Sequence, residues 1–434
     1  MKNSTCAIFG GQKAVSGKVL KWPPVEIEEY DVVKNMLERK ELSYYGREGK
    51  ILELEEDFKK YHNINYALAT SSGTAALHSA FVACDIGPGD EVIAPTHTFL
   101  ATVTPIIATN GIPVLVDCEL DTENIDPKGI EKAITKNTKA IVVTHLWGHP
   151  VEMDPILELA KKHNLKVIED CSHAHGATYK NRKVGTLGDV ACFSLQSKKI
   201  VSAGQGGMLI TNNQEIYEKA VLFGHFRVRS EDSVVTPSLR QFSDTGYGLN
   251  YRMHSLAAAM AVVQFGKLDE RIFIRQQKLD YLTKGLTSIK GITPPQTREH
   301  VTRGAFYGYK PRYNSAELGG LSYDMYLRAL QAEGAKVKST GSKPLHLSQL
   351  FSGINDGLDN FSASLPSSRK SYKLGDLPVS EFVQSISLSL PTFTYEPYSL
   401  IDEYLEAFYK VSNQWENLLD LEESQNKTLV SDIL

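Results

Sequence analysis

A carboxylate and a lysine each follow an apolar run in this chain of 434 residues. Asp170 ends the run "KVIED" (166–170), and Lys198 and Lys199 follow "CFSLQS" just before a glycine-rich stretch. A carboxylate at the end of a buried strand needs a partner, because an unpaired buried charge is costly. A lysine in a partly desolvated site has a lowered pKa and can form a Schiff base with an aldehyde. These residue types suit a ligand that carries an aldehyde and a protonated ring nitrogen.

Simpler interpretations of the same residues stay open. Asp170 could cap a helix or form a structural ion pair, and Glu169 points to the other face of the strand. Most lysines are exposed, so a loop lysine without a chemical role is the ordinary outcome. Chemistry alone does not choose between the adjacent Lys198 and Lys199.

A third group of residues, "SSGTAAL" (71–77), follows the apolar run 66–70 and opens a helix. Free N–H groups at a helix N-terminus favour an anion such as a phosphate, although a simple serine cap explains the same letters. Phe99 follows the run 91–95 and could cover an aromatic ring. Amine, carboxylate, phosphate cradle and aromatic ring are together the parts needed to hold pyridoxal 5'-phosphate.

The elements that must position these residues alternate regularly along the chain. Runs rich in valine and isoleucine, with helical spacing between them, predict a mainly parallel sheet covered by helices on both faces. In such a sheet, ligands collect at the carboxyl ends of the strands. The expected strands are 66–70, 91–95, 112–117, 139–145, 166–170, 189–195 and 207–212, the last two joined by a hairpin-like or irregular connection.

The C-terminal third has a different, mixed pattern. We expect one long helix over 254–286, kinked at Gly266, as a bridge between two domains. Beyond it, the letters predict a strand over 304–313, helices over 322–335 and 399–419, and a loop excursion around 350–375.

Composition and charge exclude several classes of protein. Hydrophobic residues make up 42% and charged residues 23%, as in soluble globular proteins, and the net charge of −4 supplies no basic field for nucleic acid or anionic lipid. Five cysteines, with no C-x-x-C pair, suggest neither a disulfide framework nor a metal site. No secretory signal is recognisable at the N-terminus, and no apolar stretch reaches the roughly 18 residues of a membrane span, so a cytoplasmic protein is expected.

Eight motifs follow one another along the chain. They are "SSGTAAL", "PTHTFLATVTPIIATNGIPVLVD", "KAIVVTHLWGHPVEMDPI", "IEDCSHAHGA", "GDVACFSLQSKKIVSAGQGG", "GYGLNYRMHSLAAAM", "KPLHL" and "SISLSLPTF". In this order the motifs resemble those of the DegT/DnrJ/EryC1/StrS family of sugar aminotransferases. That resemblance implies fold type I of the pyridoxal-phosphate-dependent transferases, the aspartate aminotransferase-like α/β fold. It also implies a large coenzyme-binding domain over 1–270 and a smaller C-terminal α+β domain over 271–434.

The resemblance also assigns roles to single residues. It implies that Lys199 binds the coenzyme covalently and that Asp170 pairs with its pyridine nitrogen. His173 stands where many members have glutamine beside the phenolic oxygen, and a neutral imidazole can still donate one hydrogen bond there. The other implied contacts are Gly73, Thr74 and Ser194 to the phosphate, Phe99 to the ring, and Asn250 to the phosphate of a neighbouring subunit in a homodimer with shared sites.

The implied reaction is transamination from L-glutamate or L-glutamine to a keto-sugar, nucleotide-linked in most members, or to a keto-cyclitol. Two alternatives are a dehydratase of the same fold, in which histidine replaces the lysine, and a non-catalytic regulator on the same scaffold. The intact set of Lys199, Asp170 and phosphate-site residues argues against both. Further residues that could contact substrate, or lie at a domain interface, are Tyr45, Arg47, Arg252 and His346.

Overall fold

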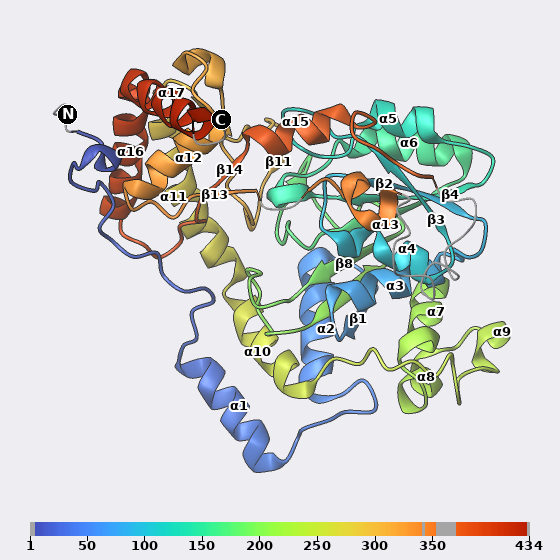
Figure 1. Cartoon of the computed structure of the whole chain (residues 1–434). Helices are drawn as coiled ribbons and strands as arrows, with labels where there is room; N and C mark the ends of the chain where they lie inside the picture. The colour runs from blue at the N-terminus through green and yellow to red at the C-terminus, as the bar shows by residue number, and fades with distance from the viewer. Residues whose placement is uncertain (1–4, 341–342, 353–369, 432–434) are drawn as a thin grey trace.

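The computed structural model describes residues 5–340, 343–352 and 370–431, and a central sheet dominates this part of the chain (Figure 1). The sheet has seven strands in the order β1-β9-β8-β5-β4-β2-β3. All seven expected strands are confirmed, each to within a residue or two at its ends. They are β1 (Tyr66–Thr70), β2 (Glu91–Pro95), β3 (Ile112–Val116), β4 (Thr138–Thr144), β5 (Lys166–Asp170), β8 (Val190–Ser194) and β9 (Gly207–Thr211).

Strands β3, β2, β4, β5 and β8 run parallel, and β9 is antiparallel to both β8 and β1. In the β8–β9 pair, Ser194 lies opposite Gly207, so the loop 195–206 that carries Lys199 closes an antiparallel hairpin. This confirms the expected hairpin-like connection, since antiparallel neighbours need no crossover helix.

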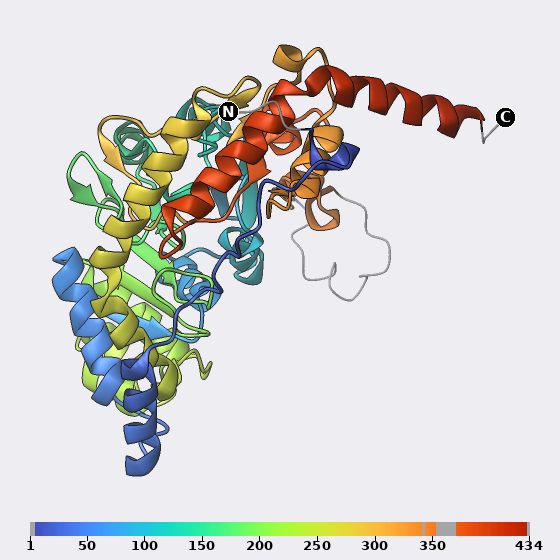
Figure 2. The same ribbon diagram turned by 90° about the vertical axis from the view of Figure 1, so that its left-hand side faces the viewer.

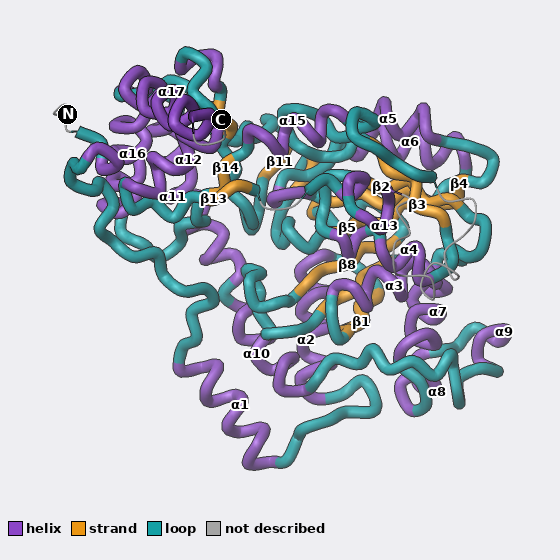
Figure 3. Tube along the Cα trace, viewed as in Figure 1, coloured by secondary structure: helices purple, strands orange, loops and turns teal. Residues whose placement is uncertain are grey.

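Figure 3 shows the orange strands of the sheet among purple helices. Alternate residues of a strand point to opposite faces, and here they pack in two separate cores. Val167 and Phe193 pack in one core with α2 (Gly49–His62), α6 (Met153–His163) and α10 (Ser255–Gly266). Leu68 and Ile168 pack in a second core with α3 (Gly73–Ala83), α4 (Thr104–Ala108) and α7 (Gln214–Gly224). Burial on both faces explains why the strands are apolar throughout.

A further core lies in the C-terminal part of the chain, and Cys6 and Val15 of the N-terminal segment belong to it. Its helices are α11 (Leu268–Leu286), α12 (Tyr323–Ala332), α16 (Tyr398–Asn413) and α17 (Trp415–Ser431). Figure 2 shows α17 projecting from the rest of the molecule. The predicted long helix over 254–286 is present as two consecutive helices. Because α10 ends at Gly266 and α11 begins at Leu268, the break expected at Gly266 is confirmed.

The remaining elements are short. The predicted strand over 304–313 is wrong for most of its length, because only β12 is a strand there and Phe306 has a positive φ of 44°. Most of the predicted loop excursion around 350–375 lies outside the described residues. The smaller sheets are β10 (Ile292–Thr293) with β12 (Arg312–Tyr313), β11 (Val301–Thr302) with β6 (Thr178–Tyr179) and β7 (Arg182–Lys183), and β13 (Lys338–Ser339) with β14 (Leu388–Ser389). The other α-helices are α1 (Ile27–Arg39), α5 (Pro127–Ala133), α8 (Val228–Ser233), α9 (Pro237–Arg240), α13 (Gln349–Ser352) and α15 (Pro378–Ile386).

Among the helices described, none is both long and apolar enough to cross a bilayer.

Candidate active site

Two adjoining cavities open at the carboxyl ends of the parallel strands. The first, which we call the Lys199 cavity, has a volume of about 410 Å³ and is lined by Asp170, Ser194, Lys199 and the first residues of α3. The second, the Lys310 cavity, has a volume of about 530 Å³ and lies toward the C-terminal part of the chain. Thr98, Phe99, His173, Lys198 and Tyr307 line both cavities, so the two form one continuous space.

Strand alternation places Asp170 in the Lys199 cavity. Asp170 lies on the same face of β5 as Ile168, toward α3, and it is buried. Its Oδ2 accepts a hydrogen bond of 2.7 Å from the Thr102 hydroxyl, and its Oδ1 accepts one of 3.0 Å from the Ser172 N–H. The carboxylate is therefore held in place from two sides while it still lines the cavity.

Three buried threonines form a hydroxyl network behind Asp170. Thr98 Oγ1 lies 2.9 Å from both Thr102 Oγ1 and Thr144 Oγ1. Thr102 donates its hydroxyl proton to Asp170. The Thr102 oxygen can therefore accept a hydrogen bond from Thr98 or from Thr144. The network extends from the end of β4 to the carboxylate and fixes the rotamer of Thr102.

Glu169 points to the opposite face, as predicted, and its hydrogen bonds are structural. Glu169 Oε2 lies 3.0 Å from His145 Nε2, and Val151 N–H donates to His145 Nδ1 at 3.0 Å. Burial raises the pKa of Glu169, but the bonds from His145 and from backbone N–H groups lower it overall. His145, Glu169 and Cys171 lie close enough together to hold a metal ion. However, both carboxylate oxygens of Glu169 and both ring nitrogens of His145 already have hydrogen-bond partners. The backbone donors to Glu169 are Gly185, Leu187 and Gly188.

The structure separates the two adjacent lysines. Lys199 is buried and Lys198 is exposed, although both line the Lys199 cavity. The Lys199 carbonyl accepts a hydrogen bond of 2.8 Å from Trp22 Nε1. The side-chain Nζ of Lys199 lies 3.9 Å from the centre of the Tyr307 ring. Burial lowers the pKa of Lys199 to about 8, against an opposing effect of the Asp170 charge. A substantial fraction of this amine is thus neutral, and nucleophilic, near neutral pH.

Helix α3 points its N-terminus into the Lys199 cavity. The Ser72 hydroxyl caps the helix by accepting from Ala75 N–H at 3.0 Å, and Gly73 and Thr74 at the next two N–H positions line the cavity. A Cβ on Gly73 would lie 2.9 Å from Ser194 Cβ, so only glycine allows the helix to approach β8 this closely. Free N–H groups with two hydroxyls form a cradle suited to a phosphate.

His173 lies in a stack of three aromatic rings. Its ring is 5.4 Å from Trp147 and 4.1 Å from Tyr307, at interplanar angles of 14° and 18°. Burial, followed by the charges of Lys199 and Lys310, places its pKa well below the usual value. The imidazole is thus neutral, and its buried Nδ1 has no hydrogen-bond partner in the described part of the protein.

Two predicted site residues, Phe99 and Asn250, are exposed in this chain. Phe99 lines both cavities and is 60% exposed. Asn250 is exposed, and its backbone pairs with His225; it lines neither cavity of this chain. Of the predicted site residues, seven are thus brought together here, and Asn250 stays a prediction about a second subunit.

The other candidate substrate contacts lie elsewhere within the described residues. Arg47 forms an ion pair with Glu55 at 2.8 Å. His346 is buried between Thr96 and Glu381, and it lies 2.8 Å from each. Arg252 stacks on Tyr45 at 4.9 Å. None of the four lines either cavity of this chain, so for these residues a contact with substrate stays a prediction.

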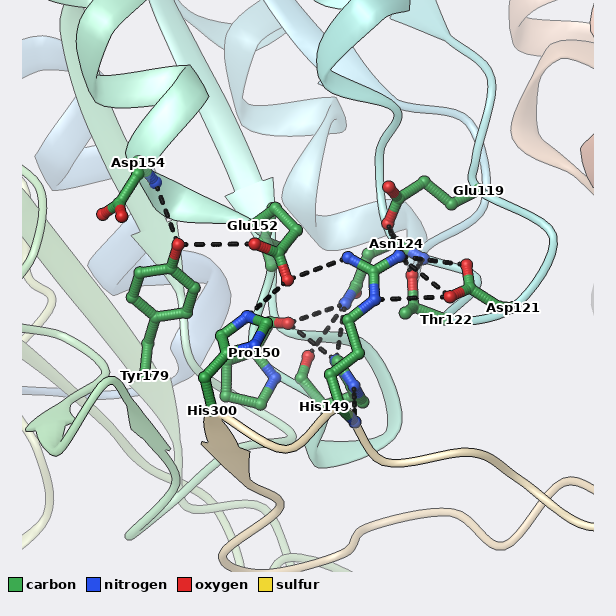
Figure 4. Close-up of polar contacts among 12 residues, drawn as sticks. Glu119, Asp121, Thr122, Asn124, His149, Pro150, Glu152, Asp154, Tyr179 and His300 are labelled. Carbon is green, nitrogen blue, oxygen red and sulfur yellow. Dashed lines mark hydrogen bonds and ion pairs between the residues drawn. The ribbon is translucent and has the colours of Figure 1, made fainter.

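Sequence reasoning missed Trp147, Tyr307 and Lys310, which reach the cavities from irregular segments. Their proximity is a tertiary fact: a Cβ on Gly308 would lie 2.5 Å from the Trp147 ring, and no sequence signal reveals this. The segment that carries Tyr307 and Lys310 is anchored upstream by an ion-pair cluster, shown in Figure 4 with its labelled acids. Arg298 pairs with Glu119, Asp121 and Glu152 at 3.0, 2.9 and 2.8 Å, and Glu152 also binds His300 at 2.7 Å.

Comparisons with known proteins identify the class. The DegT/DnrJ/EryC1/StrS aminotransferase family matches residues 25–393, most of the chain. The chain belongs to this family and is an aminotransferase. The family resemblance and the fold type I architecture predicted above are both confirmed.

Relatives and solved structures agree with this assignment. An L-glutamine:2-deoxy-scyllo-inosose aminotransferase of Streptoalloteichus tenebrarius is 33% identical over 338 residues, which cover 77% of this chain and 76% of the relative. A GDP-perosamine synthase of Caulobacter vibrioides is 36% identical, with coverage of 75% and 84%. An aminotransferase structure from Psychrobacter cryohalolentis superposes with a TM-score of 0.79 at 27% identity, covering 92% of this chain and all of that one.

Proposed function

We propose that this aminotransferase uses pyridoxal 5'-phosphate to transfer an amino group from L-glutamine or L-glutamate to a keto-sugar or keto-cyclitol. The observation that carries the proposal is the meeting of a buried amine, a buried carboxylate and a helix N-terminus in one cavity, at Lys199, Asp170 and Gly73. The names of the relatives support the substrate class, since they include a glutamine-dependent cyclitol aminotransferase and the synthase of a GDP-linked amino sugar.

The residues present fit the coenzyme. Lys199 offers an amine that no acidic group within the described residues neutralises by direct contact, and burial keeps its pKa near 8. His173 carries an orphaned ring nitrogen, as expected for a group that awaits a polar ligand atom. The close approach of Gly73 to Ser194 leaves a cradle that any larger residue would fill. A cavity of about 410 Å³ is of the size that small-molecule sites have.

When bound, the coenzyme would supply the electron sink that makes the donor's α-proton labile. Lys199 would then act as the base that takes this proton and returns it, with Nζ as the proton-carrying atom. Asp170, held by Thr102 and Ser172, would keep the ring nitrogen protonated. His173 would donate a hydrogen bond to the phenolic oxygen.

The remaining predicted contacts complete the arrangement. Gly73, Thr74 and Ser194 would bind the phosphate, and Phe99 would cover the ring. Asn250 would contact the phosphate of a second subunit, which its exposure in a single chain permits. We accordingly propose a cytoplasmic homodimer with shared sites, and domains over 1–270 and 271–434. The separate C-terminal core supports this division except for Cys6 and Val15, which pack in that core.

Borohydride reduction tests the coenzyme and its attachment. The purified protein should be yellow, and reduction should bleach it and leave the coenzyme's mass on the peptide that contains Lys199. Lys199→Ala protein should keep its fold by circular dichroism and lose both the label and all turnover. Lys198→Ala, one residue away, should keep the fold and the label. A label on Lys198, or substantial turnover by Lys199→Ala protein, would refute the assignment.

A mixing experiment tests the shared site. Lys199→Ala and Asn250→Ala proteins should each be inactive or nearly so, and hybrid dimers formed after mild dissociation should regain activity. Restoration is expected because one site of each hybrid has both residues intact. Hybrid dimers that form, by size and mass, and yet stay inactive would count against the shared site.

A further inference from the structure

The lining of the Lys310 cavity has an unbalanced charge. Four of its side chains are cationic, and within the described residues its lining contains neither aspartate nor glutamate. The cations come from segments far apart in the sequence, so the fold gathers them at this place. They are Lys198, Arg275, Lys310 and Lys343.

Lys310 is the most enclosed of the three lysines, at 8% exposure. Its Nζ donates a hydrogen bond of 2.7 Å to Ser389 Oγ and lies 4.4 Å from the centre of the Trp147 ring. Burial lowers the pKa of Lys310 to about 8, while the charge of Glu123 opposes that shift. An ammonium group has three protons to donate, so Ser389 leaves donor capacity unused.

The nearest acid is already engaged. Glu123 Oε2 accepts hydrogen bonds from Trp147 Nε1 at 2.7 Å and His97 Nε2 at 3.1 Å. No ion pair joins Glu123 to Lys310 within 4.0 Å among the described residues. Glu123 thus holds the Trp147 ring beneath Lys310 without neutralising the lysine by contact.

Arg275 adds a second buried cation with neutral partners. Its Nε donates to Thr394 Oγ1 at 2.9 Å and its Nη1 to the Ala305 carbonyl at 2.7 Å. Arg275 forms no ion pair within 4.0 Å among the described residues. The charge of Glu396 offsets part of its desolvation cost, and a bound anion would offset more.

The cavity is also connected to the reaction centre. The Trp147–His173–Tyr307 stack extends from the ring beneath Lys310 to the ring beside Lys199 Nζ. A ligand seated against Lys310 can thus extend along these rings into the Lys199 cavity.

We propose that Lys310 and Ser389, with Arg275 nearby, bind an oxyanion group of a reactant while its reacting end lies at Lys199. The proposal rests on the proposed transamination and adds to it a charged reactant. The oxyanion has two sources, a carboxylate of the amino donor or the diphosphate of a nucleotide-linked sugar. Both offer the same chemistry to an ammonium group, and they are distinguished by titration with separate probes.

Calorimetric titration of the coenzyme-loaded protein tests the site. The probes are glutarate, a dicarboxylate without an amino group, and the nucleoside diphosphates UDP and GDP. We expect Lys310→Met to weaken binding of one kind of probe by at least about tenfold, because a hydrogen bond to a charged group is lost. If Lys310→Met protein loses affinity for glutarate, the site binds the amino donor. If it loses affinity for UDP and GDP, the site binds the amino acceptor.

Matched variants separate charge from packing. Lys310→Arg keeps the cation and should retain much of the affinity, and Ser389→Ala should weaken it by a smaller factor. Lys290→Met is the control, because Lys290 also lies over a tryptophan ring, 5.3 Å from that of Trp415, but outside the cavity. Lys290→Met protein should bind each probe with the same affinity as the unchanged protein.

Two outcomes would overturn the proposal: equal binding of every probe by unchanged and Lys310→Met protein, or binding of none by the unchanged protein. The same titrations on coenzyme-free protein keep this test independent of the proposed function. If borohydride labelling at Lys199 fails while probe binding still depends on Lys310, the coenzyme proposal is refuted and the oxyanion site is retained.

Discussion

When the pH of a solution of coenzyme-free protein is raised, the Lys199 amine should lose its proton with a midpoint near pH 8. Burial moves its pKa from the ordinary 10.5 to about 8, and Asp170 opposes this shift. Only the neutral amine reacts with an aldehyde, so reactivity should rise about tenfold per unit of pH below 8 and level off above it.

The magnitude follows from the neutral fraction. At pH 7, about one Lys199 amine in ten should be neutral, against about one in 3,000 for an ordinary lysine. The burial of Lys199 therefore makes it about 300 times more reactive at neutral pH than a solvated amine of equal nucleophilicity.

The assay is brief labelling with an amine-selective reagent between pH 6 and pH 11, with the Lys199 peptide quantified by mass spectrometry. An unfolded peptide of the same local sequence serves as the reference. Asp170→Asn removes the charge that opposes the shift, so it should move the midpoint to lower pH. A midpoint near 10.5, or an upward shift in Asp170→Asn protein, would refute the reasoning.

Three further predictions follow from single contacts. Thr102→Val removes the 2.7 Å hydrogen bond to Asp170 and should lower kcat by about tenfold or more, with an unchanged melting temperature; equal kcat would contradict the positioning role. Gly73→Ala should weaken coenzyme affinity in equilibrium dialysis, because the new methyl group would lie 2.9 Å from a carbon of β8, and unaltered affinity would show that the cradle tolerates a side chain. Glu169→Met leaves the His145 ring and three N–H groups without an acceptor, and should lower the free energy of unfolding in urea by about 3–5 kcal/mol. A loss under about 1 kcal/mol would mean that water replaces the carboxylate.

Much of the large sheet was predictable because its strands are buried on both faces. Such strands are continuous apolar runs, and the alternation of residues along β5 assigns Asp170 and Glu169 to opposite sides without further information. Asp170, Ser194 and the start of α3 could be expected together because parallel strands place their carboxyl ends at one edge.

The C-terminal half of the site could not be predicted in this way. Tyr307 and Lys310 lie on an irregular segment, and an irregular backbone has no periodicity to reveal its orientation. His346 stands in a family motif, and its ring nitrogens lie within hydrogen-bond distance of Thr96 and Glu381, partners that the sequence does not reveal.

By itself, the sequence determined the order of the strands along the chain, the family and the residue types that we propose for the chemistry. Periodic burial and short motifs are local properties, which the letters record directly. Only the tertiary structure decided that Lys199 is buried and Lys198 exposed, and that Lys310 lies over Trp147 with no acidic partner in contact among the described residues. Desolvation and charge pairing depend on what surrounds a group in space, and those surroundings come from segments more than a hundred residues apart.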